Sequence, residues 1–277
     1  MKIGVVGAGT MGRGIVQVFA QAGYDCMLVD ISLELAENGK EQIASALDRL
    51  VRKQKMDPDL KNQILAAIHP GETGDLHSCA VVVEAIVEDM AIKHSLFASL
   101  SQICPPETIF ASNTSALSLT ELSADLDRPV LGLHFFNPAP VMQLVEVVSG
   151  LGAVEENVAT LMQLVRDIGK TPIRVREAPG FVVNRILIPM INEAITVLHE
   201  GTATAEAIDQ AMKLGANHPI GPLALADLIG NDVVLAIMNV LHQETGDSKY
   251  RPCPLLRQMV RARLLGRKTG RGFFIYS

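Results

Sequence analysis

Short apolar runs alternate with amphipathic stretches over the first two thirds of the chain. The runs at 3–6, 26–29, 81–83 and 108–111 each lead into a glycine, an acidic residue or a small polar residue. Apolar runs of this length are typical of parallel strands that are buried on both faces. The stretch from Glu155 to Gly169 has helical spacing, with Gly169 at its C-terminal end, and precedes a last strand at 172–175. The pattern therefore predicts an α/β domain with a mostly parallel sheet.

The strand pattern stops at Pro179-Gly180, which we interpret as a domain boundary. Beyond it lie long apolar segments with helical spacing at 181–198, 222–242 and 254–265. We therefore expect a Rossmann-type domain at 1–179 and an all-helical domain at 180–277. Helices this apolar usually pack against each other or against another subunit, so we also expect a homo-oligomer.

Residues 33–67 predict two charged amphipathic helices, broken near Asp57-Pro58. This stretch is longer than a simple crossover and indicates a helical pair inserted into the sheet domain. Its basic residues have two interpretations, a solvated helix face or a seat for the phosphates of a nucleotide-bearing substrate. They are Arg49, Arg52, Lys53 and Lys55.

Charge and length exclude some classes of function. The 277 residues include 24 basic and 30 acidic side chains, which give a formal charge of −6. Nucleic acid is not an expected partner, because its binding depends on basic side chains that neutralise phosphates. No run of about eighteen apolar residues lacks both charge and proline, so no membrane span is expected.

The cysteines indicate the compartment. Cys26, Cys79, Cys104 and Cys253 are scattered and form no CxxC pair. This spacing predicts neither a zinc site nor a disulfide framework, and it suits the reducing cytoplasm. The histidines share no metal-ligand spacing either, so no metal is expected.

A glycine-rich turn follows the first predicted strand. Gly7, Gly9 and Gly12 open a helix, a second strand follows, and Asp30 ends that strand 23 positions after Gly7. This is the arrangement of a dinucleotide-binding unit, in which the helix N-terminus and the turn hold the pyrophosphate. A carboxylate at Asp30 would accept hydrogen bonds from the adenosine ribose and repel a 2′-phosphate. The expected cofactor is therefore NAD rather than NADP.

Two further predicted strands end in polar residues. The strand at 81–83 leads to Glu88 and Lys93, and the strand at 108–111 leads to the small polar segment 112–115. Open α/β sheets bind ligands at the carboxyl ends of their strands. Glu88 and Lys93 are thus candidate cofactor contacts. The segment 112–115 has two interpretations of equal weight, a ligand contact or an ordinary polar loop.

One histidine and one carboxylate flank a turn-rich connection. His134 ends an apolar run, Glu146 lies within the next run, and Asn137-Pro138-Ala139-Pro140 separates the two runs. If the two runs form adjacent strands, they bring an imidazole and a carboxylate together. A histidine general base requires such a partner to fix its tautomer and stabilise its charge.

With these motifs in place, the chain closely resembles the 3-hydroxyacyl-CoA dehydrogenases of the bacterial 3-hydroxybutyryl-CoA dehydrogenase type. The resemblance spans essentially the whole chain in the correct order. It is carried by the motifs at 7–12, 83–88, 112–115, 132–138, 179–185, 214–219 and 266–272. The inserted helical pair matches the family less distinctively.

The resemblance implies a reaction and a set of site residues. The family interconverts (S)-3-hydroxyacyl-CoA and 3-ketoacyl-CoA with NAD, and it is dimeric through its helical C-terminal domain. His134 matches the catalytic base and Glu146 its paired carboxylate, while Ser115 and Asn184 match residues that bind substrate and position the reacting oxygen. The matched cofactor contacts are the turn residues Gly7, Gly9, Thr10, Met11 and Gly12, together with Asp30, Glu88, Lys93, Ser115, Asn137 and Lys268. Lys53 matches a contact to CoA.

Two other functions stay open at this point. A β-hydroxyacid dehydrogenase acting on a free acid would share the framework, but that group relies on a lysine for proton transfer. A crystallin-like, non-catalytic nucleotide-binding protein would keep the fold without the chemistry. Against the first, the motif here supplies His134 and Glu146 rather than a lysine, and against the second, Ser115, His134, Glu146 and Asn184 are all present.

Overall fold

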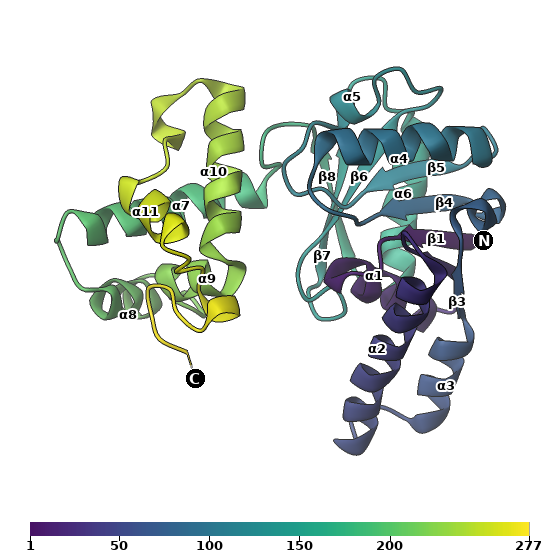
Figure 1. Cartoon of the computed structure of the whole chain (residues 1–277), viewed down its shortest axis with the longest axis horizontal. Helices are drawn as coiled ribbons and strands as arrows, with labels where there is room; N and C mark the ends of the chain where they lie inside the picture. The colour runs from purple at the N-terminus through teal and green to yellow at the C-terminus, as the bar shows by residue number, and fades with distance from the viewer. Residues whose placement is uncertain (277) are drawn as a thin grey trace. The chain divides into compact units, whose positions relative to one another are not determined.

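The computed structural model describes residues 1–276 (Figure 1). The chain divides into two compact units, Met1–Glu177 and Ala178–Ser277. The first contains a sheet with helices, and the second contains helices joined by short connections.

An eight-stranded sheet forms the centre of the first unit, in the order β3-β2-β1-β4-β5-β6-β7-β8. Neighbouring strands run parallel except for the antiparallel pair β6 and β7. From β1 the chain first adds strands on one side, β2 and β3, and then continues on the other side with β4 and β5. Sheets of this kind bind nucleotides at this switch point, between β1 and β4. The predicted Rossmann-type sheet is confirmed. Its strands are β1 (Lys2–Val6), β2 (Asp25–Val29), β3 (Ile68–Gly71), β4 (Val81–Glu84), β5 (Ile109–Ser112), β6 (Val130–Phe135), β7 (Leu144–Ser149) and β8 (Thr171–Arg176).

Helices cover this sheet and bury its apolar side chains. The first, α1, contributes Ile15 and Phe19 to a core that includes Val5, Leu28 and Val83, and all five residues are fully buried. Burial of such side chains is the main favourable term in folding. The helices are α1 (Thr10–Gln21), α2 (Leu33–Arg52), α3 (Pro58–Ala66), α4 (Met90–Ile103), α5 (Leu119–Leu122) and α6 (Glu155–Asp167), with a 3₁₀ turn η1 at Thr73–Ser78.

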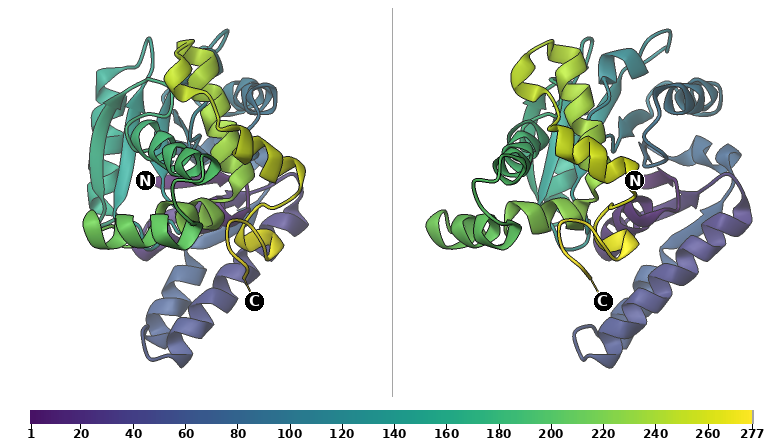
Figure 2. Two further views of the ribbon diagram at one scale, coloured as in Figure 1. Left: turned by 90° about the vertical axis from the view of Figure 1, so that its left-hand side faces the viewer. Right: turned by 60° about the vertical axis from the view of Figure 1, so that its left-hand side comes forward.

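The inserted helical pair is confirmed as α2 and α3, which extend side by side away from the sheet (Figures 1 and 2). The second helix of the pair, α3, begins at Pro58, as the break near Asp57-Pro58 predicts. Pro58 occupies the first turn of α3, and the side chain of Asp57 accepts a hydrogen bond from the Asp59 N–H at 2.7 Å.

One strand was not expected from the pattern. β3 contains His69 and Pro70 between Ile68 and Gly71, so it lacks a continuous apolar run. It lies at the edge of the sheet, beside β2. Proline is tolerated there because one side of an edge strand needs no ladder hydrogen bond.

The second unit is built from helices, as predicted. Its core includes Ile191, Leu223, Met238 and Leu241. The helices are α7 (Val183–His199), α8 (Ala205–Gly215), α9 (Pro222–Ile229), α10 (Asn231–Thr245) and α11 (Pro254–Arg261), with short 3₁₀ turns η2 (Ser248–Tyr250) and η3 (Arg267–Thr269). Two isolated β-bridges, Gly266 to Arg271 and Arg271 to Ile275, close the loop near its end.

The apolar segment 222–242 is two helices rather than one. Gly230, with φ of 106°, separates α9 from α10, and the two axes differ by 97°. Within residues 1–276 no single helix is long and apolar enough to cross a membrane, although α9 and α10 together reach that length and composition.

All four cysteines are free thiols and all are buried. Burial raises the pKa of the Cys26 thiol to about 12 and that of Cys79 to about 11, and it also raises the pKa of Cys104. Because the thiolate is the nucleophile, a buried thiol with a raised pKa reacts slowly.

We therefore expect no rapidly reacting thiol in the folded protein. Titration with Ellman's reagent at mildly alkaline pH should label none of the four cysteines within the time that labels all four in denaturant. A single fast-reacting thiol in the native protein would contradict the buried positions of these side chains.

Candidate active site

The candidate active site lies at one edge of the sheet in the first unit. β1, β2, β4, β5 and β6 run parallel, so their carboxyl ends meet at this edge, and the antiparallel β7 begins there. The glycine turn follows β1, and Asp30 follows β2. The predicted polar residues therefore converge on the ligand-binding edge of an α/β sheet.

The three glycines of the turn have different physical roles. Gly7 has φ of 104°, and a Cβ atom there would lie 2.6 Å from the Ala85 carbonyl oxygen. A Cβ on Gly12 would lie 1.7 Å from the Gly7 carbonyl oxygen, so only glycine lets α1 pack this closely. A Cβ on Gly9 would meet no protein atom within 4 Å. The small size of Gly9 thus leaves space for a group outside the protein.

This turn suits the pyrophosphate of a dinucleotide. α1 begins at Thr10, and no side chain caps its N-terminus. The first N–H groups of a helix, together with its dipole, favour an anionic ligand at that end. Thr10 is exposed and Met11 is half-buried, so both predicted contacts lie at the start of this helix.

Asp30 lies beside the glycine turn and is held in place by it. Its Oδ2 accepts a hydrogen bond from the Ala8 N–H at 2.6 Å, and its Oδ1 accepts one from the Ile31 N–H at 2.7 Å. Each carboxylate oxygen can accept more than one hydrogen bond, so Asp30 keeps the capacity to bind ribose hydroxyls. The observed geometry fits the predicted dinucleotide.

His134 and Glu146 touch each other, as the predicted strand pairing requires. They are directly opposite residues of β6 and β7, and His134 Nδ1 lies 2.7 Å from Glu146 Oε2. His134 is 3% exposed, Glu146 is fully buried, and the Phe136 ring centroid lies 4.5 Å from the imidazole centroid. The carboxylate therefore fixes the tautomer with the proton on Nδ1, and Nε2 becomes the nitrogen suited to proton exchange.

Lys93 and Glu88, the predicted cofactor contacts after β4, belong to an internal network. Lys93 is 1% exposed, and its Nζ lies 2.5 Å from Glu84 Oε1 and 3.3 Å from Glu88 Oε2. The Glu88 side chain is 44% exposed. Glu88 thus reaches the surface, whereas Lys93 lies inside the protein.

Glu84, the buried partner of Lys93, is not among the residues that the sequence predicts for the site. Its only signal is a carboxylate at the end of an apolar strand.

The segment 112–115 is tied to its neighbours on both sides. Glu88 Oε1 accepts hydrogen bonds from Thr114 Oγ1 at 2.7 Å and from the Ser115 N–H at 2.8 Å. On the other side, Asn113 Oδ1 accepts a hydrogen bond from the Phe135 N–H at 2.8 Å. The segment 112–115 is therefore anchored at Ser115 to Glu88, in the connection after β4, and at Asn113 to Phe135, at the end of the strand β6 that carries His134.

The other predicted residues lie in several parts of the chain. Asn137 is exposed and precedes a cis bond to Pro138 in the connection between β6 and β7. Asn184 is the second residue of α7 in the second unit. Lys268, also in the second unit, forms an ion pair with Asp232 at 2.5 Å.

The basic residues of the helical pair, Lys53 among them, are exposed at the end of α2. Arg49 and Arg52 lie in its last turn, where cations interact favourably with the helix dipole. This arrangement favours the solvated-face interpretation for those two.

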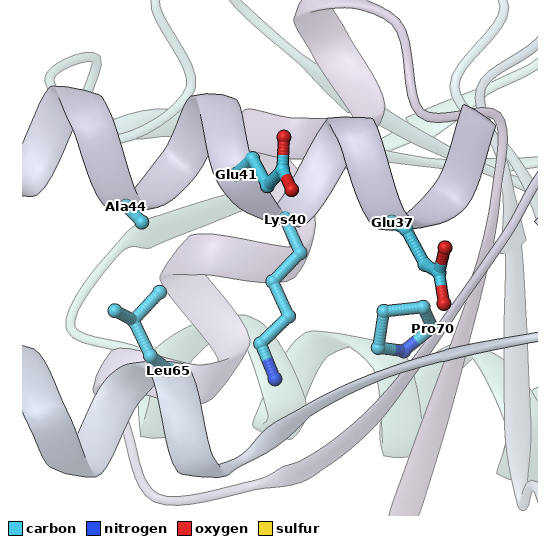
Figure 3. Close-up of a pocket in the computed structure, with 6 residues that line it drawn as sticks. All are labelled: Glu37, Lys40, Glu41, Ala44, Leu65 and Pro70. Carbon is cyan, nitrogen blue, oxygen red and sulfur yellow. The ribbon is translucent and has the colours of Figure 1, made fainter. Parts of the chain in front are cut away.

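A separate hollow of about 580 Å³ lies between α2, α3 and β3 (Figure 3). Lys40 points into it, beside Leu65 and Pro70, and Glu37 and Glu41 contribute two carboxylates. This mixed lining does not suit a phosphate group. Among residues 1–276, no cluster of three or more histidine, cysteine or acidic side chains could hold a metal ion.

Comparison with known proteins covers both units of the chain. The NAD-binding domain model of 3-hydroxyacyl-CoA dehydrogenase matches residues 2–178, and the C-terminal domain model of the same family matches residues 180–276.

Similar proteins agree over the full length. A 3-hydroxybutyryl-CoA dehydrogenase from Clostridioides difficile is 51% identical, with all of both chains covered. One from Bradyrhizobium diazoefficiens is 47% identical over 99% of this chain and 95% of its own. The crystal structure of (S)-3-hydroxybutyryl-CoA dehydrogenase from Ralstonia eutropha superposes with a TM-score of 0.96 at 49% identity, covering 100% of this chain and 99% of that one. The chain therefore belongs to the 3-hydroxyacyl-CoA dehydrogenase family and uses NAD as its cofactor.

Proposed function

We propose that this enzyme interconverts (S)-3-hydroxybutyryl-CoA and acetoacetyl-CoA, a reaction of fatty acid metabolism. The observation that carries the proposal is the buried contact of 2.7 Å between His134 and Glu146, at the sheet edge that also holds the glycine turn. A proton-transfer pair beside a dinucleotide site is what oxidation of a secondary alcohol requires. The relatives named 3-hydroxybutyryl-CoA dehydrogenase support this substrate.

His134 exchanges the proton of the reacting oxygen. In oxidation, its neutral imidazole accepts the proton of the 3-hydroxyl through Nε2, and in reduction the imidazolium returns it to the 3-keto oxygen. Bound NAD supplies the hydride acceptor and NADH the donor. Glu146 keeps the imidazole in the productive tautomer and stabilises the imidazolium.

Ser115 and Asn184 hydrogen-bond the reacting oxygen of the substrate as charge develops on it. The backbone of Ser115 is held by Glu88, which supports a fixed position for its hydroxyl. Glu88, Asn137 and Lys268 contact the cofactor, Lys93 supports this contact from within, and Lys53 contacts CoA.

The two domains have different roles in the proposed reaction. Residues 1–179 bind NAD, and residues 180–277 bind substrate and form a homodimer. Exposed apolar side chains on the helices of the second unit, among them Ile186, Leu214 and Leu228, support association through this region. The buried free thiols suit a cytoplasmic enzyme.

The substrate assay separates the proposed function from its alternatives. The purified enzyme should consume NADH with acetoacetyl-CoA and be nearly inactive with free acetoacetate, because the CoA moiety contributes binding energy. A series of 3-ketoacyl-CoA chain lengths should show the highest kcat/KM for the four-carbon substrate. Activity only with the free acid would favour a β-hydroxyacid dehydrogenase. NADH binding without turnover of any 3-ketoacyl-CoA would favour a non-catalytic protein.

Replacement of the acid–base pair should impair turnover rather than cofactor binding. For His134→Ala we expect kcat to fall by about 10²–10⁴-fold, the usual contribution of general acid–base catalysis. NADH affinity, measured by fluorescence, should change little. Glu146→Gln should lower kcat less, because the imidazole keeps a hydrogen-bonding partner while its imidazolium loses an anionic one. Near-normal turnover of His134→Ala would disprove its role as the acid–base group.

Asp30→Ala should weaken NADH binding by about 10- to 100-fold, since a hydrogen bond to a charged group contributes about 1.5–3 kcal/mol. The informative quantity is the ratio of the Kd values for NADPH and NADH, because loosening of the glycine turn affects both cofactors alike. This ratio should decrease in the variant. An unchanged ratio would show that Asp30 only anchors the turn through Ala8.

A further inference from the structure

Glu84 is a buried carboxylate for which the proposed chemistry has no direct use. It is the last residue of β4 and has no exposed surface, and it lies between Val6 of β1 and Ser112 of β5. A buried charge is costly unless it is paired and hydrogen-bonded. Because well-packed apolar residues often stabilise a protein as well as a buried ion pair does, the carboxylate calls for a reason beyond stability.

Three donors from three different segments meet at Glu84. The Ile86 N–H donates to Oε1 at 2.7 Å, Lys93 Nζ of α4 donates to the same oxygen at 2.5 Å, and Ser112 Oγ of β5 donates to Oε2 at 2.5 Å. One side chain therefore holds together the connection after β4, the following helix and the end of the next strand.

Two routes lead from Glu84 to the segment that carries Ser115. In the first, Lys93 Nζ contacts both Glu84 and Glu88, with 3.3 Å between Nζ and Glu88 Oε2. The other oxygen of Glu88, Oε1, accepts a hydrogen bond from the Ser115 N–H at 2.8 Å. In the second, Ser112 Oγ accepts a hydrogen bond from the Thr114 N–H at 3.2 Å. Both routes end at adjacent residues, so the backbone at 114–115 is fixed from two sides.

The charge of Glu84 determines where the ammonium of Lys93 lies between its two carboxylate partners. The ammonium of Lys93 is shared between two carboxylates, one buried and one partly exposed. Without the charge of Glu84, Lys93 would be attracted to Glu88 alone and would move toward it. Glu88 also holds Ser115, so a shift of this pair would move the hydroxyl that binds the reacting oxygen.

We propose that Glu84 is a positioning residue, which sets Ser115 and Glu88 in the geometry of hydride transfer through Lys93 and Ser112. This inference rests on the proposed function, because it concerns the placement of groups that bind substrate and cofactor. Glu84 itself touches neither of them. Its effect should therefore appear in turnover more than in binding.

The primary test is Glu84→Gln, which preserves the shape of the side chain and removes its charge. We expect kcat for acetoacetyl-CoA reduction to fall by about 10- to 100-fold, since small misplacements of reacting groups have effects of this size. The KM for acetoacetyl-CoA should change by less than about threefold, because the lost interaction concerns the transition state. Normal kcat in Glu84→Gln would overturn the proposal.

A double variant separates positioning from stability. Lys93→Met alone leaves the Glu84 charge buried without its cation and should lower the thermal midpoint strongly. Glu84→Gln combined with Lys93→Met removes both charges and should recover much of that midpoint, but its kcat should stay low. If turnover recovers together with stability, Glu84 is only the structural partner of Lys93 and the proposal is wrong.

Asp209→Asn is the matched control in the second unit. Asp209 is also buried, and its carboxylate accepts hydrogen bonds from the N–H groups of Leu223 at 2.8 Å and Ala224 at 2.9 Å. This variant should lower the thermal midpoint without lowering kcat at temperatures where it is folded. A loss of kcat as large as that of Glu84→Gln would overturn the proposal, because any buried carboxylate would then have the same effect.

The parent enzyme in the same assay distinguishes the two proposals. An inactive parent would overturn the proposed function and, with it, the positioning role. An active parent with an equally active Glu84→Gln variant would overturn the positioning role alone.

Discussion

The register of the antiparallel pair β6 and β7 is the constraint on which the candidate active site depends. Side chains alternate between the two faces of a strand, so a slip of one residue would turn Glu146 to the opposite face and remove it from His134. The neighbouring pair Leu133 and Val147 is fully buried, and a slip would expose or misplace these apolar side chains as well. Core packing therefore enforces the contact between imidazole and carboxylate.

The direction of β7 matters as much as its register. The parallel strands β1 to β6 all deliver their carboxyl ends to one edge of the sheet. β7 runs the other way, so Glu146 lies near its beginning and still faces the same edge. The pair of His134 and Glu146 thus shares one edge with the glycine turn, which lies more than a hundred positions earlier in the chain.

Much of this architecture could be predicted from the sequence because the relevant signals are local. The apolar runs of β1, β2 and β4, the glycine turn and the proline at the start of α3 each depend on a few adjacent residues. β3 was missed because its strand geometry comes from pairing with β2, while His69 and Pro70 hide the apolar pattern. The bend at Gly230 was missed because both of its flanks are apolar and helical.

The site shows the same division between local and long-range signals. Glycines and strand-end carboxylates can be read from their spacing, but the partners of a buried charge come from distant segments. The sequence makes Lys93 a candidate cofactor contact, but it does not indicate that the ammonium lies enclosed between Glu84 and Glu88. Only tertiary structure shows that a lysine nine residues after Glu84 turns inward to meet it, because helical periodicity alone does not specify which charge will be buried.

The burial of all four thiols makes the protein convenient to label at a chosen position. The native cysteines would compete little for a thiol-reactive dye, so none of them needs to be replaced. Ile31, whose side chain is 93% exposed directly after Asp30, is a suitable position for an introduced cysteine. A fluorophore attached there would lie beside the glycine turn and could report the arrival and departure of a dinucleotide in real time.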